Sequence, residues 1–227
     1  MHDRRGVASV SVIDLAYLNL NRADLDQTSL LARLPLLFAP YYVMDGMNRH
    51  GVAVADMSVP AAQAPSSPGK PSIIQSTLMR LILDQARSVD EALQIIDQYN
   101  VHFVQHREHL MIADATGRSV VIEFVESQVR VTESSEPWQV CTNHLICDKT
   151  EEENDATCPR YRAGSDGTAV APPVDSLDDA QALVRRMSVD NWTMWTSVYD
   201  LNTLQLRVLY KSRPDVRHDD QVDQAGQ

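Results

Sequence analysis

The feature that most constrains the fold is a stretch of alternating apolar and polar residues in the second half of the chain. It runs through Leu110–Ala113, Ser119–Val125, Gln128–Thr132 and Gln139–Thr142, with turn residues between the segments. A period of two places every second side chain on the same face of a strand, so these segments are predicted to form an antiparallel meander. Its apolar face must be covered by another layer.

Helical periodicity predicts that covering layer. Apolar residues recur at helical spacing over Ser72–Ala86, and a second helix is predicted to begin at Ser88, where Glu91 stands in a capping-box position. An amphipathic helix over Ser176–Met187 and a short helix over Thr28–Phe38, stopped by a proline, are predicted on similar grounds.

Further strands are predicted before and after these helices. Val7–Leu15 and Gly51–Val59 indicate strands, and Trp195–Leu201 with Leu204–Tyr210 indicates a hairpin. Residues 60–71, 149–155 and 164–173 are predicted to be loops, because they are polar or rich in proline and glycine. The order of elements predicts an α+β fold, with one domain over residues 1–214 and a flexible tail over 215–227.

Composition limits the classes of function. The 227 residues give a formal net charge of -11, and no cluster of lysine and arginine could follow a phosphate backbone, so no nucleic-acid partner is predicted. No apolar run approaches the roughly 18 residues of a membrane span. Cys141, Cys147 and Cys158 are odd in number and lack CxxC spacing, so reduced thiols are expected.

The segment Pro40–Val54, PYYVMDGMNRHGVAV, is the most distinctive in the chain. It closely resembles the DGMN(E)KGLAV signature of the choloylglycine hydrolase and acyl-CoA:6-aminopenicillanate acyltransferase-like superfamily. In that superfamily, a turn with Asp, Gly and Asn leads into a core strand beneath the active site.

Other motifs match the same superfamily in its order. Val140–His144 is similar to its Thr-Asn pair at a strand end, and Asp114 to Glu123 resembles the hairpin before that pair. Pro159–Arg162 resembles an Arg-aromatic step, and Trp195–Leu201 resembles the closing hairpin. The matches span nearly the whole chain.

This resemblance implies a four-layer αββα fold of the N-terminal-nucleophile type and hydrolysis of, or acyl transfer from, a linear amide C–N bond. The nucleophile would be an N-terminal cysteine whose own α-amine, with a reference pKa of about 7.7 to 8.0, acts as the base. Fixed amide donors would stabilise the oxyanion. We expect a small-molecule amide substrate, no cofactor and no metal.

The resemblance also suggests which residues form the site. Asn143 would donate its side-chain amide to the oxyanion. Arg160 would support the nucleophile or the substrate, with Arg162 as the alternative if the alignment shifts by two residues. Ser58, beside Met57, stands where relatives often have an Asn whose backbone amide completes the oxyanion hole.

Asp45 and Asn48 are weaker candidates for the substrate pocket. Asx side chains commonly bond their own backbone, so both residues are expected to hold the turn rather than to perform chemistry.

The start of the chain departs from the superfamily pattern. Nothing before Val7 encodes the Cys-led strand or the Gly-Arg-Asn-x-Asp hairpin that follows it. We therefore expect this chain to be inactive alone, with catalysis requiring an upstream segment. The alternative is a noncatalytic homologue that keeps a binding pocket; use of an internal cysteine after proteolysis is disfavoured.

A metal site is a third hypothesis. His102, His106 and His109 would share one face of a helix, but the apolar residues around them favour a turn entering a strand, and no HExxH is present. The acyl and amine groups of the substrate stay open, with residues 60–71 and 147–173 as candidate pocket loops. The compartment is also open, cytoplasmic if no leader precedes the chain, and a homo-oligomer is possible through an exposed sheet edge.

Overall fold

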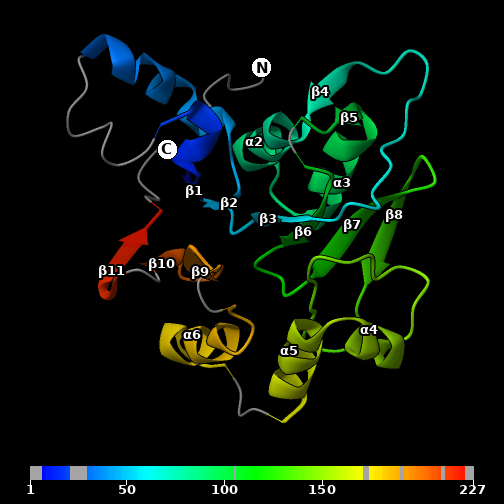
Figure 1. The fold of residues 1–227 in the computed structure, drawn as a ribbon, viewed down its shortest axis with the longest axis vertical. Helices are drawn as coiled ribbons and strands as arrows, with labels where there is room; N and C mark the ends of the chain where they lie inside the picture. Colours follow the sequence, from blue (N-terminus) through cyan, green and yellow to red (C-terminus); the bar gives the residue numbers. More distant parts are fainter. Residues whose placement is uncertain are drawn as a thin grey trace.

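The computed structural model describes residues 7–20, 30–104, 106–170, 174–189, 192–210 and 213–222. Its largest element is a six-stranded antiparallel sheet with the order β1-β2-β3-β6-β7-β8 (Figure 1). The strands are β1 (Ser9–Val12), β2 (Asp45–Asn48), β3 (Ala53–Ser58), β6 (Glu108–Ala113), β7 (Ser119–Val125) and β8 (Gln128–Glu133). The predicted meander is therefore confirmed for its first three segments. The fourth, Gln139–Thr142, forms no strand.

Two helices cover one face of this sheet, as predicted. They are α2 (Gln75–Gln85) and α3 (Val89–Asp97), and the buried side chains between helices and sheet form the largest apolar cluster. Ser88 caps α3 by accepting a hydrogen bond from the backbone amide of Glu91. The sheet and α2 approach so closely at Gly46 that an added Cβ would lie 2.9 Å from Leu83. Only glycine fits that approach without displacement.

A three-stranded sheet covers part of the opposite face. It contains β9 (Trp195–Asp200), β10 (Gln205–Tyr210) and β11 (Arg213–Gln221), and it packs on the larger sheet through Met47, Leu204 and Val222. Helix α6 (Leu177–Arg185) lies on its outer side, where Arg207 of β10 pairs with Asp178. The successive layers are α2 with α3, the six-stranded sheet, the three-stranded sheet and α6 (Figure 1). The α+β fold of antiparallel sheets predicted from the sequence is confirmed.

Helices α4 (Glu151–Thr157) and α5 (Pro159–Val170) contradict the loops predicted at residues 149–155 and 164–173; residues 171–173 lie outside the described residues. Thr150 and Glu153 form a complete capping box, and Glu151 and Glu152 add acidic side chains to the first turn, where the helix dipole favours them. The acidic run therefore begins a helix. Both helices lie below β6 and β7 in Figure 1.

Other segments differ from their predictions. The helix expected over Thr28–Phe38 is a 3₁₀ helix, η2 (Leu30–Tyr41), which continues past Pro40; Thr28 itself lies outside the described residues. Pro35 and Pro40 lie inside η2, and most of its leucines are exposed rather than buried, so neither backbone bonding nor packing favours an α-helix there. A second 3₁₀ helix, η1 (Leu15–Leu18), follows β1.

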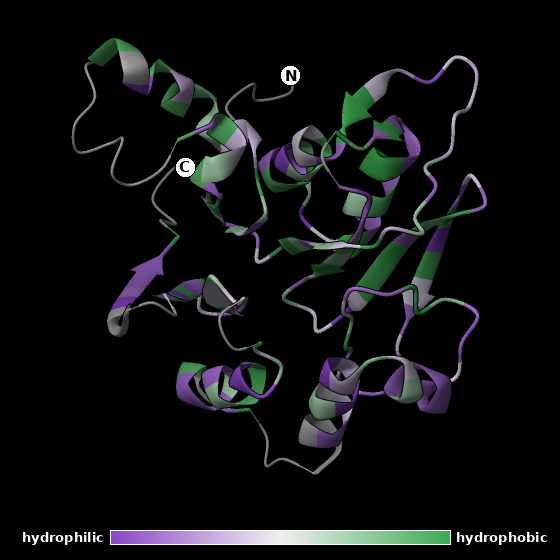
Figure 2. Ribbon diagram, viewed as in Figure 1, coloured by the Kyte–Doolittle hydropathy of each residue, from purple (hydrophilic) through white to green (hydrophobic). Residues whose placement is uncertain are grey.

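The start of the Ser72–Ala86 prediction is a strand rather than a helix. Strand β4 (Ser72–Ile74) pairs in parallel with β5 (Asn100–His102) before α2 begins. The flexible tail predicted after residue 214 is wrong up to Gln221, because β11 pairs with β10 through that residue. Figure 2 shows β11 as hydrophilic, and this polarity is the reason that its sequence was not predicted to form a strand. Within the described chain, no helix is long and apolar enough to cross a membrane.

Candidate active site

Asn143 lies at the centre of the candidate site, with its side chain fixed from both ends. Its amide nitrogen Nδ2 donates a hydrogen bond of 2.9 Å to the backbone carbonyl of Ser58 at the end of β3. Its oxygen Oδ1 accepts a hydrogen bond of 2.8 Å from Nη2 of Arg160 in the first turn of α5. An amide nitrogen carries two hydrogens. The side chain is exposed, and one N–H can still donate to a ligand.

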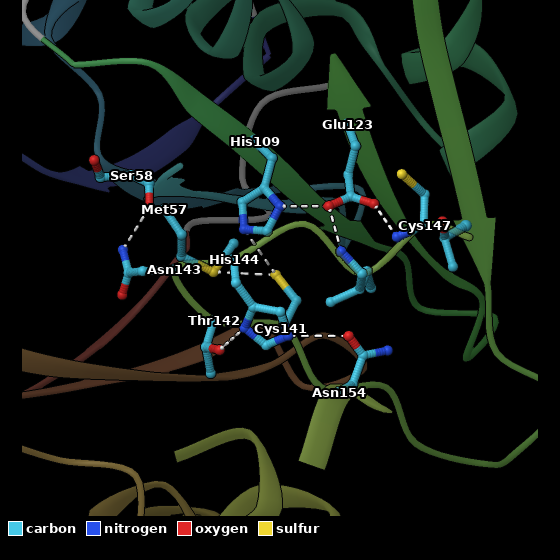
Figure 3. Close-up of polar contacts among 12 residues, drawn as sticks. Met57, Ser58, His109, Glu123, Cys141, Thr142, Asn143, His144, Cys147 and Asn154 are labelled. Atoms are coloured by element: carbon cyan, nitrogen blue, oxygen red, sulfur yellow. Dashed lines mark hydrogen bonds and ion pairs between the residues drawn. The ribbon is translucent and has the colours of Figure 1, made fainter. Parts of the chain in front are cut away.

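The loop that carries Asn143 is held by a buried histidine and a buried carboxylate (Figure 3). Nδ1 of His109 lies 3.2 Å from Oε1 of Glu123, and both side chains are fully buried. Glu123 also accepts hydrogen bonds from the backbone amides of Ile146, at 2.8 Å, and Cys147, at 2.5 Å. One carboxylate therefore ties the loop to β7.

The ionisation of Glu123 follows from these donors. Burial raises the pKa of the Glu123 carboxyl, but the hydrogen bonds from His109, Ile146 and Cys147 outweigh it, and the pKa falls below the ordinary value. A carboxylate cannot donate, so Nδ1 of His109 carries the proton of this bond.

A second histidine supports the same loop from the side of α4. Nδ1 of His144 lies 3.0 Å from the hydroxyl of Thr142, and Nε2 lies 3.0 Å from Oδ1 of the buried Asn154. Burial lowers the pKa of His144, which favours the neutral ring. Since Oδ1 of Asn154 can only accept, Nε2 donates and Nδ1 accepts from Thr142. The ring of Tyr161 packs edge-on against His144 at 5.6 Å.

The structure brings the predicted site residues Ser58, Met57 and Arg160 together with Asn143. Ser58 and Arg160 bond Asn143 directly. Met57 lies beneath, with Sδ 3.2 Å from Sγ of Cys141. Arg162 points elsewhere: it is exposed and lies 3.9 Å from Asp166, one turn along α5.

Asp45 and Asn48 serve the fold. The buried Asp45 accepts hydrogen bonds from Nε1 of Trp195, at 2.8 Å, and from the hydroxyl of Tyr199, which connects the two sheets. Burial raises the pKa of Asp45 despite these donors.

Asn48 is fully buried and bonds only backbone groups. Its Nδ2 donates to the carbonyls of Leu83 and Ala86, and its Oδ1 accepts from the amides of His50 and Val52. All four of its bonding positions are used, so its side chain has none left for a substrate.

The three cysteines differ in acidity. Burial raises the pKa of Cys141, and it raises that of Cys147 to about 12 with help from Glu123. Burial also opposes ionisation of Cys158. This effect is outweighed by hydrogen bonds from the Thr142 hydroxyl and the backbone amides of Tyr161 and Arg160, together with the Arg160 charge, so the pKa of Cys158 is lowered. Cys158 is therefore the thiol most easily ionised. It lies between the end of α4 and the start of α5.

The three histidines of the metal hypothesis do not form one helical face. His102 is exposed in β5, His106 is exposed in the following loop, and His109 is buried in β6 against Glu123. In the part of the chain that the structure describes, no group of three or more His, Cys, Asp or Glu side chains is arranged to hold a metal ion.

Comparison with protein families identifies the relationship. Residues 38–166, more than half of the chain, match the family described as acyl-coenzyme A:6-aminopenicillanic acid acyl-transferase. The chain belongs to this family. The match includes Ser58, Asn143 and Arg160. A comparison with curated proteins found no match.

Two solved structures share the fold of this acyltransferase-family chain. A penicillin V acylase from Agrobacterium tumefaciens is 17% identical, with a TM-score of 0.57, over 74% of this chain and 63% of that one. A conjugated bile acid hydrolase from Clostridium perfringens is 15% identical, with a TM-score of 0.68, over 81% of this chain and 74% of that one. The chain thus spans less than two thirds of the length of the acylase. The fold is that of the N-terminal-nucleophile hydrolases.

The residues that support the Asn143 loop were not predicted from the sequence. Glu123 had been noted only as part of a hairpin motif, and Asn154 only as part of an acidic loop. The available signal was a glutamate within an otherwise apolar strand, SVVIEFV, since a buried carboxylate requires partners. No comparable signal marks Asn154, because the helix that carries it was predicted to be a loop.

Proposed function

We propose that the protein hydrolyses a linear amide C–N bond, or transfers its acyl group, and that this chain supplies the oxyanion side of the site. The observation that carries the proposal is the fixed amide of Asn143. Ser58 takes one hydrogen of Nδ2 and Arg160 holds Oδ1, so the second hydrogen is oriented before any substrate binds. Donors oriented in advance stabilise a developing oxyanion without a reorganisation cost.

The proposed nucleophile is an N-terminal cysteine that lies outside these 227 residues. Each of the three cysteines here is internal, so its α-nitrogen is part of a peptide bond and cannot act as a free amine base. Cys141 and Cys147 are further disfavoured because burial raises the pKa of both thiols. Catalysis would proceed by thiolate attack on the carbonyl, release of the amine and transfer of the acyl group to water or another acceptor.

The proposed substrates are N-acyl amides of small molecules. By their names, the solved relatives act on penicillin V and on conjugated bile acids. Aromatic acyl, long-chain acyl and steroid acyl amides therefore form a suitable panel.

The test compares two purified proteins on fluorogenic amides from this panel. One is the present chain, and the other is extended upstream to the first in-frame strand that begins with cysteine. We expect hydrolysis only by the extended protein, with Asn143→Ala lowering its kcat about 100- to 1000-fold. Equal rates in the extended protein and its Asn143→Ala variant would contradict the role of Asn143.

A noncatalytic binding protein is the alternative proposal. Under this alternative, both proteins would bind amides without cleaving them, and cooperative thermal unfolding would show that both are folded. An exposed amide donor also binds a carbonyl that is not cleaved, so turnover by the extended protein decides between the two.

A further inference from the structure

The thiol of Cys141 adds a third group to the buried pair of His109 and Glu123. Its Sγ lies 3.6 Å from Nε2 of His109, and the three side chains come together beside the Asn143 loop (Figure 3). Nδ1 of His109 carries the proton of its bond to Glu123, so in the neutral ring Nε2 accepts and the thiol donates. Sδ of Met57 lies nearer to Sγ, at 3.2 Å, but a thioether is only a weak acceptor. The bonds therefore run from Cys141 through His109 to Glu123.

This chain of bonds holds the Asn143 loop at both ends. Cys141 begins the loop, two residues before Asn143, and backbone amides at the other end of the loop donate to Glu123. Residues 134–149 belong to no strand, so no backbone ladder fixes this segment to a sheet. The position of the loop relative to the strands depends on side-chain bonds instead, and three of them meet at His109 and Glu123.

His109 also lies next to the strand that supplies the acceptor for Asn143. Across the antiparallel pair of β3 and β6, His109 is opposite Met57, the residue directly before Ser58. The carbonyl of Ser58 accepts the hydrogen bond from Nδ2 of Asn143. The ring of His109 therefore sets how far Cys141 lies from these strands, and the Asn143 side chain spans that separation when it bonds Ser58.

The same three groups do not form a second nucleophile. A thiol, an imidazole and a carboxylate in this order can generate an attacking thiolate. Here Cys141 is only 7% exposed, and burial raises the pKa of its thiol. The geometry fits a role in holding the loop better than a role in attack.

We propose that His109 is a positioning residue for the amide chemistry, and that it sets the place of the Asn143 amide by holding Cys141. This inference rests on the proposed function. A donor stabilises an oxyanion only from the correct position, and a misplacement of about 1 Å can lower a rate by about 100-fold. His109 therefore affects turnover more than it affects substrate binding.

The first test is steady-state kinetics on variants of the extended protein, with each rate divided by the folded fraction that urea unfolding gives. His109→Phe keeps a ring but loses both bonds, and it should lower kcat about tenfold or more while KM changes by less than about twofold. His109→Gln keeps a donor and an acceptor and should recover most of this loss. His102→Phe, at an exposed histidine of β5, is the matched control and should leave kcat unchanged.

Cys141→Ala makes the test independent of whether His109→Phe folds. It removes only the thiol and leaves the bond between His109 and Glu123 in place. It should lower kcat by less than His109→Phe does, with KM again nearly constant. Complete loss of activity would instead make this thiol the nucleophile and would overturn the proposal.

A measurement on the present chain needs no turnover. The side-chain amide resonances of Asn143 in ¹⁵N-labelled protein, assigned by their loss in Asn143→Ala, should shift in Cys141→Ala and stay unchanged in His102→Phe. If the extended protein is inactive while this shift appears, the proposed function fails and the positioning role stands. Unmoved Asn143 resonances, unchanged kcat in both His109→Phe and Cys141→Ala, or no recovery in His109→Gln would each overturn the proposal.

Discussion

The guanidinium of Arg160 donates to Oδ1 of Asn143, and this bond fixes the direction in which the Asn143 side-chain amide points. Without it, the amide could rotate and present its oxygen, which repels an oxyanion. The backbone carbonyl of Ser58 reinforces the same orientation from the other side. A charged residue 17 positions away in the sequence thus controls the direction of a neutral donor.

Arg160→Met should lower kcat of the extended, active protein about tenfold or more, because the Asn143 amide loses its fixed orientation. Steady-state kinetics on the best amide of the panel measure the effect. Arg162→Met is the matched control, since that side chain is exposed and lies near Asp166 instead. Equal losses in the two variants would indicate a general charge effect rather than orientation of Asn143.

Glu123→Gln should lower the free energy of unfolding by about 1 to 3 kcal/mol, because it weakens the bonds that His109 and two loop amides make to a carboxylate. The folded-state pKa of Glu123 is below its unfolded value, so its contribution is present above pH 4.5 and is lost as pH falls below it. Urea unfolding at pH 7 and pH 4 measures this. The difference from wild type should shrink at the lower pH, and Glu126→Gln should show no such loss.

Asp56→Asn should have the opposite pH dependence. Burial and Glu108 raise the folded-state pKa of Asp56, so the folded protein retains a proton that the unfolded chain releases as pH rises above about 4. The native state is therefore penalised increasingly with pH, and the Asn variant avoids this penalty. Relative to wild type, its stability should rise by about 1 kcal/mol or more between pH 5 and pH 8. A constant difference over this range would show that Asp56 titrates normally.

Cys158 should be the first thiol alkylated by iodoacetamide in the folded protein. Arg160 and backbone amides lower its pKa, whereas the pKa values of Cys141 and Cys147 are raised. Peptide mapping after brief treatment at pH 7.5 identifies the modified residue. Preferential labelling of Cys147, which is also half-buried, would contradict this order.

Gly164→Ala should destabilise the protein by about 1 to 3 kcal/mol. A Cβ at this position in α5 would lie 3.0 Å from Sδ of Met187 and 3.0 Å from Val140. Helix propensity alone would favour alanine, so stabilisation would show that α5 can move away from Val140 without loss. Thermal unfolding of the two proteins measures the difference.

The sequence predicted the parts of the fold in which periodicity and packing agree. Strand β7 and helix α3 combine a clear apolar period with turn or capping residues. The bounds of β7 were predicted correctly, and α3 begins directly after Ser88, its predicted cap. Helix α4 was missed because its polar sequence matches a mobile loop in composition, and only the spacing of Thr150 and Glu153 distinguishes it. Strand β11 was missed because its pairing with β10 comes from tertiary contact rather than from an apolar pattern.

The candidate site was predictable only where a motif marked it. Asn143, Arg160 and Ser58 came from short matches to relatives, and the structure brings them within hydrogen-bonding distance. Asp56 and Glu108 were not predicted to lie near each other, because they are 52 positions apart in the chain. Their meeting depends on the register between β3 and β6, which the sequence does not specify by itself.

The hydrogen bonds that hold Asn143 come from β3 and α5, and among the described residues none comes from the three-stranded sheet. That sheet joins the rest through the bonds of Asp45 to Trp195 and Tyr199 and through one apolar cluster. Substitutions on its outer surface, in its hairpin or in α6 should therefore have little effect on the orientation of Asn143. Substitutions at the end of β3 or the start of α5, which supply those hydrogen bonds, should disturb it most.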